Sequence, residues 1–164
     1  MKNGHGGLAE LLELMEDIDY ALLTTRAKDG FLVSRPLSTQ TADPDGTLWF
    51  FVSDHSRKAE EIAIEPRVNL AYSAPDKNTY ISIAGVASIE KDQAKIDELW
   101  SDALSVFFPG GRDDPELALL KVTIHRAEYW DGPSTTLGKA WKFITAAVSD
   151  KPADMGDHGT VSVR

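Results

Sequence analysis

Arg57 and Lys58 stand next to each other in the first turn of a helix predicted over residues 56–65. The dipole of a helix places partial positive charge at this end, so two cations there are unfavourable unless an anion lies beside them. The free backbone N–H groups of the first turn would add donors at the same place. This pattern predicts a site for an anion such as a phosphate monoester. In the alternative interpretation both cations are solvated and pair with Glu60 and Glu61.

A second candidate is Arg35, in a strand predicted over residues 31–40. Its neighbours are apolar or carry hydroxyl groups. Pro36, directly after it, removes one ladder N–H, which indicates an edge strand or a bulge. An arginine that faces the core needs a partner, whereas in a cleft its guanidinium offers a planar set of donors. The alternative is a solvent-facing arginine on a half-exposed strand.

Aromatic residues form the third feature. Trp49, Phe50 and Phe51 lie in one predicted strand just before the basic helix start, and Trp130 and Trp141 lie near the C-terminus. Consecutive residues of a strand face opposite sides, so one set of these rings must be core. The other set can be core, an interface or a platform for a planar ligand, and core is the interpretation that we favour.

Composition excludes several other kinds of chemistry. There are no cysteines, which removes disulfides, thiolate metal sites and a cysteine nucleophile. The four histidines have no ligand spacing, so we expect no metal. The net charge of −9 argues against a nucleic-acid partner and against docking on an anionic membrane. Since no apolar run approaches the ~20 residues of a membrane span, we expect a cytoplasmic protein.

The elements that must position these residues follow from periodicity. Alternation and turn residues predict six strands, over residues 20–25, 31–40, 47–52, 67–73, 79–90 and 117–130. Helical spacing predicts helices over residues 8–17, 56–65, 91–106 and 134–148. Most strands follow one another in hairpin order, with Asp-Gly turns between the first of them, so the sheet should be antiparallel. Closure into a small barrel would remove its edges.

The length of 164 residues fits one domain. Residues 1–7 contain three glycines and are predicted to be a flexible lead. Residues 8–148 carry all the predicted strands and helices and form the domain. Residues 149–164 have little periodicity and are predicted to be a mobile tail, in which Val161 and Val163 can pair briefly.

Over residues 8–148 the order of elements resembles the pyridoxamine 5′-phosphate oxidase-like split-barrel flavoproteins, and among them the general stress protein 26-type branch. The resemblance rests on the successive segments YALLTT, FLVSRPLS, DGTLWFFVS, SRKAEEI, RVNLAYS and YISIAGVASI. It implies a mainly β (α+β) fold, a six-stranded antiparallel split β-barrel with flanking helices. It also implies a homodimer that holds FMN at the subunit interface.

The resemblance further implies which residues hold the cofactor. The positions that match along the flavin and its ribityl chain are Ser34, Arg35, Pro36 and Leu37, and those on the adjoining strand are Phe50, Phe51, Val52 and Ser53. The phosphate matches Arg57 and Lys58. The side chains that approach from across the site are Thr79 and Tyr80, and the candidate ring neighbours are Trp130 and Trp141. The phosphate position coincides with the anion site that the helix start indicates by itself.

No residue stands out as a catalytic acid or base. The resemblance implies an FMN-binding general stress protein, and we expect a flavin-dependent oxidoreductase of unknown substrate. The alternatives are a non-catalytic flavin-binding or flavin-storing stress protein, or a barrel that uses another phosphorylated cofactor such as a deazaflavin. The chain ends in DKPADMGDHGTVSVR, without the basic segment by which true pyridoxamine phosphate oxidases recognise substrate. We therefore expect no oxidation of pyridoxamine phosphate.

Overall fold

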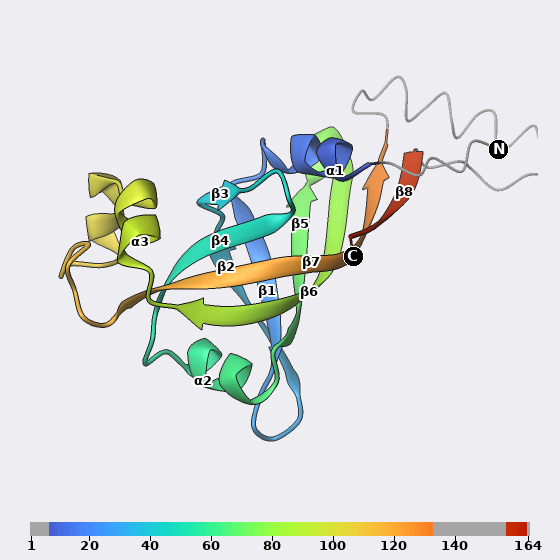
Figure 1. Ribbon diagram of the computed structural model, residues 1–164. Helices are drawn as coiled ribbons and strands as arrows, with labels where there is room; N and C mark the ends of the chain where they lie inside the picture. Colours follow the sequence, from blue (N-terminus) through green and yellow to red (C-terminus); the bar gives the residue numbers. More distant parts are fainter. Residues whose placement is uncertain (1–6, 133–156, 164) are drawn as a thin grey trace, which may run out of the picture.

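The computed structural model describes residues 7–132 and 157–163 (Figure 1). Its helices are α1 (Leu8–Met15), α2 (Arg57–Ile64) and α3 (Gln93–Leu99), with 3₁₀ helices over Pro75–Lys77 and Asp102–Val106. Its strands are β1 (Tyr20–Arg26), β2 (Leu32–Ser38), β3 (Thr41–Ala42), β4 (Thr47–Ser53), β5 (Arg67–Ala74), β6 (Thr79–Glu90), β7 (Leu117–Asp131) and β8 (Asp157–Ser162). The six predicted strands are all present, and β3 and β8 are additional.

The strands form one curled antiparallel sheet in the order β2-β1-β5-β6-β7-β4-β3, and β8 pairs with β7 beyond the reach of β4 (Figure 1). This arrangement confirms the predicted split barrel. Pro36 lies in β2, the strand at one end of the sheet, where only β1 pairs with it. A residue without an N–H costs least at such an edge.

The inner face of the sheet is the main core. Leu23, Leu70, Ile83 and Ala127 are direct cross-strand neighbours on β1, β5, β6 and β7, and all are buried. Burying each large apolar side chain is worth about 1.5–3 kcal/mol, so this row stabilises the curl of four strands at once. Helix α1 closes one end of the core with Leu11 and Met15.

A second, smaller core covers the other face of β4. Phe51 and Trp49 lie there with Ile96 of α3 and Leu119 of β7, whereas Phe50 faces the main core. Strand β4 is therefore buried on both faces, which explains why its sequence is apolar without alternation.

The segment over residues 91–106 corrects one expectation, because it is not a single helix. Helix α3 ends at Leu99, and Trp100 takes an extended conformation (ψ 136°). The Trp100 ring then packs edge-on against Phe51, with centroids 5.8 Å apart. A 3₁₀ helix follows, and its Leu104 packs on the same cluster. Packing on β4 overrides local helix propensity here.

Part of the predicted tail lies in the sheet. Of residues 149–164 the structure describes 157–163, and β8 pairs with β7 from Arg126 to Asp131. Gly159 lies against the ring of Tyr129, where a Cβ would come within 2.2 Å of a ring atom, so any larger residue would have to displace that ring. The helix predicted over 134–148 lies outside the described residues. In the described part of the chain, no helix is long and apolar enough to span a membrane.

The core generates a prediction about alkaline stability. Tyr72 is 2% exposed, and burial raises its pKa to about 12, although its hydroxyl pairs with Thr39 at 2.8 Å. The unfolded chain loses this proton near pH ~10, so the folded state binds it more tightly and stability falls as the pH rises from about 10 to about 12. The expected loss is about 2 to 3 kcal/mol.

Tyr72→Phe should lack this component of the pH dependence. The measurement is urea unfolding of both proteins from about pH 8 to about pH 12. Parallel losses of stability in the two proteins would contradict the assignment to Tyr72.

Candidate functional site

The N-terminus of α2 presents the two predicted cations. The Ser56 side chain caps the helix by accepting a hydrogen bond from the Ala59 N–H at 3.3 Å. Ala59 and Ile62 are buried and hold the helix against the barrel. Arg57 consequently projects into solvent, and Lys58 is half-buried. Figure 1 shows α2 at the end of the barrel beside the turn that joins β1 and β2.

Arg35 points to the same end of the barrel and is held there by a buried network. Its Nη1 donates to Thr25 Oγ1 at 2.5 Å, and its Nη2 donates to Glu61 Oε2 at 3.0 Å. Thr25 Oγ1 donates in turn to Glu61 Oε2 at 2.5 Å. The Glu61 side chain is 2% exposed and that of Arg35 20%, so the solvent-facing interpretation of Arg35 is wrong.

The two carboxylates of α2 are engaged elsewhere than with Arg57 and Lys58. Glu61 pairs with Arg35, and Glu60 pairs with Lys28 at 3.2 Å. Within residues 7–132 and 157–163, the side chains of Arg57 and Lys58 have no hydrogen-bond or ion-pair partner. The alternative in which these cations pair with Glu60 and Glu61 is therefore wrong.

Lys58 lies in an unfavourable environment for a cation. Burial lowers its pKa, and the nearby positive charge of Arg35 lowers it further. Both effects disfavour the charged amine, and an anion placed beside it would reverse them. Lys58 and Arg35 are the two predicted site residues that the structure brings together at this end of the barrel.

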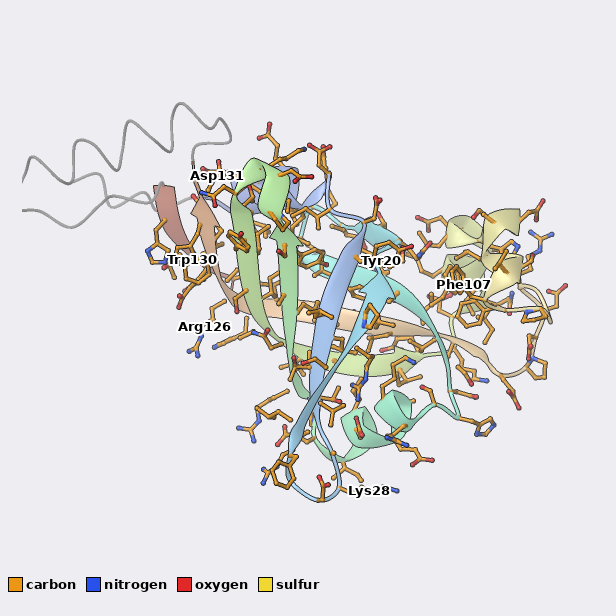
Figure 2. The ribbon with its side chains drawn as sticks, turned by 180° about the vertical axis from the view of Figure 1, so that it is seen from behind. Tyr20, Lys28, Phe107, Arg126, Trp130 and Asp131 are labelled. Atoms are coloured by element: carbon orange, nitrogen blue, oxygen red, sulfur yellow. The ribbon has the colours of Figure 1, made fainter. Side chains whose placement is uncertain are left out.

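Other predicted site residues lie on the outer face of the sheet. Ser34 and Pro36 are exposed on β2, and the Ser34 hydroxyl pairs with that of Thr24 at 2.7 Å. Tyr80 and Trp130 are direct partners across β6 and β7, and they are 41% and 43% exposed. Figure 2 shows Trp130 at the end of the sheet away from Lys28, so one chain does not bring these rings to the start of α2.

A third group is packed inside the protein. Phe50, Phe51 and Val52 are buried in the two cores, which confirms the core interpretation for the aromatic residues of this strand. Leu37 packs at the edge of the main core. A ligand could reach β4 only through its backbone or at its half-buried end, Ser53.

The last two predicted positions are Thr79 and Trp141. Thr79 is buried, donates to Asp131 Oδ1 at 2.8 Å, and borders a cavity of about 620 Å³ beside α1. That cavity contains neither Arg35 nor Lys58 among its lining residues. Trp141 lies outside the described residues. The described part of the chain contains no group of three His, Asp or Glu side chains that could hold a metal.

Sequence reasoning missed Thr25, Glu61 and His158. Alternation along β1 places Thr25 on the inner face with Ala21 and Leu23, and the helical spacing of α2 places Glu61 beside the buried Ile62. These two patterns could have predicted that Thr25 and Glu61 are buried. His158, whose ring stacks on Trp130 at 5.2 Å, carried none, because its strand pairs far away in the sequence.

Comparison with known proteins finds one family and several of its general stress proteins. The pattern of the family described as pyridoxamine 5′-phosphate oxidase like matches residues 7–154. General stress protein 26 of Bacillus subtilis (strain 168) is 34% identical over 79 residues, which are 46% of this chain and 56% of that protein. The chain thus spans about half of that relative.

Two solved structures are similar over more of the chain. A candidate general stress protein 26 from Jannaschia sp. CCS1 has a TM-score of 0.74 and 28% identity, over 94% of this chain and 99% of that one. The general stress FMN/FAD binding protein of Xanthomonas citri has a TM-score of 0.66 and 26% identity, over 77% and 89%.

The side-chain cap of α2 should contribute measurably to the free energy of unfolding. Ser56→Ala removes the acceptor for the Ala59 N–H and should cost about 1 kcal/mol of unfolding free energy. The matched control is Ser101→Ala, since Ser101 precedes a 3₁₀ helix without a side-chain cap and should change stability by less than ~0.5 kcal/mol. Chemical denaturation measures both, and equal costs would contradict the capping role.

Proposed function

Because the chain belongs to the pyridoxamine 5′-phosphate oxidase-like family, we propose that it is an FMN-binding protein of the general stress protein 26 type. The observation that carries this proposal is Lys58, a half-buried cation beside Arg35 with no anionic partner in the described chain. A phosphate monoester supplies the missing negative charge. The relative from Xanthomonas citri, described as FMN/FAD binding, supports the choice of a flavin.

The residues at the start of α2 fit a phosphate. Arg57 and Lys58 offer two unpaired cations beside the N-terminal N–H groups of the helix. Charge-assisted hydrogen bonds from such groups are worth about 1.5–3 kcal/mol each. Arg35 uses two of its N–H groups on Thr25 and Glu61 and keeps others for a ligand.

We further propose that the ring end of the cofactor is completed by a second copy of the chain. Tyr80 and Trp130 lie on the outer face of the sheet, which also exposes Tyr20 (60%), Leu22 (49%) and Leu32 (73%). Soluble monomers rarely expose large continuous apolar patches. A two-fold dimer through this face would cover it and set the rings of one chain opposite the cations of the other.

The proposed activity is that of an oxidoreductase. When bound, FMN supplies the redox chemistry, and the chain binds and orients it. Arg57 and Lys58 would fix the phosphate, and the outer-face rings would exclude water from the planar end. Reduction of the bound flavin by NADH or NADPH, followed by turnover of an acceptor, tests this activity. Flavin binding without turnover would instead indicate storage.

Removing both cations should weaken the binding of FMN but not that of riboflavin. Arg57→Ala with Lys58→Ala should lower FMN affinity by roughly two to four orders of magnitude, because two charge-assisted contacts are lost. Riboflavin has no phosphate, so its affinity should be about equal in the two proteins. Flavin fluorescence titration measures both ligands.

An unchanged FMN affinity in the folded double variant would remove the phosphate assignment. The visible spectrum of the isolated protein, with mass analysis of the released chromophore, identifies the cofactor directly. A deazaflavin mass would replace FMN while leaving the phosphate site in place.

The proposed dimer makes a separate prediction. Light scattering at micromolar concentration should give twice the chain mass. Leu22→Glu places a charge on the outer sheet face and should halve that mass and weaken FMN binding, although Leu22 is on the face opposite Arg35. Phe107→Glu is the control. Phe107 is 70% exposed directly after the 3₁₀ helix Asp102–Val106, so its replacement should leave the mass unchanged. A monomeric wild-type protein that binds FMN tightly would contradict the dimer.

A further inference from the structure

Glu61 is an unusual residue to find inside the barrel. Its carboxylate is 2% exposed and lies between α2 and the first two strands. A buried charge is costly unless it is paired and hydrogen-bonded. Here Oε2 receives both the Arg35 guanidinium and the Thr25 hydroxyl. The pairing explains how the charge is tolerated, but it does not explain why an ionic network occupies this position.

The geometry of Arg35 suggests the reason. A guanidinium carries five N–H donors in one plane. Thr25 and Glu61 each engage one of its terminal nitrogens, so two contacts pin the plane along one edge. Pinning a rigid fork at two points fixes the direction of the donors that remain. The positive charge of Arg35 is near enough to Lys58 to lower the pKa of its amine.

Thr25 links the two charged groups. Its hydroxyl accepts from Arg35 Nη1 and donates to Glu61 Oε2, so the three side chains form a closed ring of contacts. Thr25 itself is 1% exposed and cannot turn to solvent. All three contacts lie within the protein, so the network needs no ligand atom to satisfy it.

We propose that Glu61 is a positioning residue for the cofactor phosphate, which holds the Arg35 guanidinium near Lys58 both directly and through Thr25. This inference rests on the proposed function. Glu61 does not touch the phosphate. It sets the position of the arginine that does, and its negative charge offsets the repulsion between Arg35 and Lys58.

Whether the removal of Glu61 weakens or tightens anion binding distinguishes a positioning role from a purely electrostatic one. If Glu61 were only a nearby negative charge, its removal would tighten the binding of an anion. If it positions Arg35, its removal weakens that binding although the site becomes more positive. A structural ion pair alone would change thermal stability and leave the preference for FMN over riboflavin as it was.

Two variants test the proposal. Glu61→Gln removes the charge and keeps the shape, and Thr25→Val keeps every charge but deletes the hydroxyl between Arg35 and Glu61. In both, the ratio of riboflavin Kd to FMN Kd should fall about tenfold, the worth of one oriented charge-assisted contact. The control is Glu60→Gln, because Glu60 is exposed on the same helix and pairs with Lys28, and its ratio should stay within about twofold.

The outcomes are distinct. A ratio that falls in Glu61→Gln and Thr25→Val but not in Glu60→Gln supports the positioning role. A ratio that is unchanged or rises in the folded variants overturns it. If Glu61→Gln does not fold, Thr25→Val decides alone. A wild-type protein that binds FMN no better than riboflavin overturns the proposed function itself, before either variant is compared.

Discussion

The carboxylate of Glu61 joins α2 to the first two strands, and the arrangement at this end of the barrel depends on that junction. Through Oε2 it meets Arg35 of β2 and Thr25 of β1. The same helix buries Ala59 and Ile62 against the barrel, so its orientation is fixed by apolar packing and by the ion pair together. With that orientation fixed, the first turn presents Arg57 to solvent and holds Lys58 half-buried, beside the N-terminal N–H groups of the helix.

Much of the barrel was predictable because its signals are local. Alternation in β6 puts Thr79, Ile81 and Ile83 on one face of the strand, and the structure buries all three. The glycines at 30 and 46 take φ values of +90° and +87°, which explains the two Asp-Gly turns. The break at Trp100 was not predictable, because it depends on packing against Phe51, which is distant in the sequence. Strand β8 was likewise decided by a distant partner, β7.

For the candidate site the division is similar. Helix electrostatics alone indicated an anion at Arg57 and Lys58, and the structure leaves both unpaired within its described residues. Which partner Arg35 takes could not be read from its strand, since Thr25 and Glu61 reach it only through the fold. The sequence around Tyr80 and Trp130 does not indicate what these exposed rings bind. Their role depends on which molecule covers the outer face of the sheet.

Strand β4 has a consequence for the synthesis of the chain. Its main pairing partner, from Thr47 to Ser53, is β7, and β7 leaves the ribosome long after β4 does. Until then the segment TLWFFVS has only the two residues of β3 to pair with, carries no charge and is apolar on both faces. Uncharged apolar segments of this kind associate with one another when they stay unpaired. Slow translation between β4 and β7 would therefore prolong the period in which this segment stays unpaired.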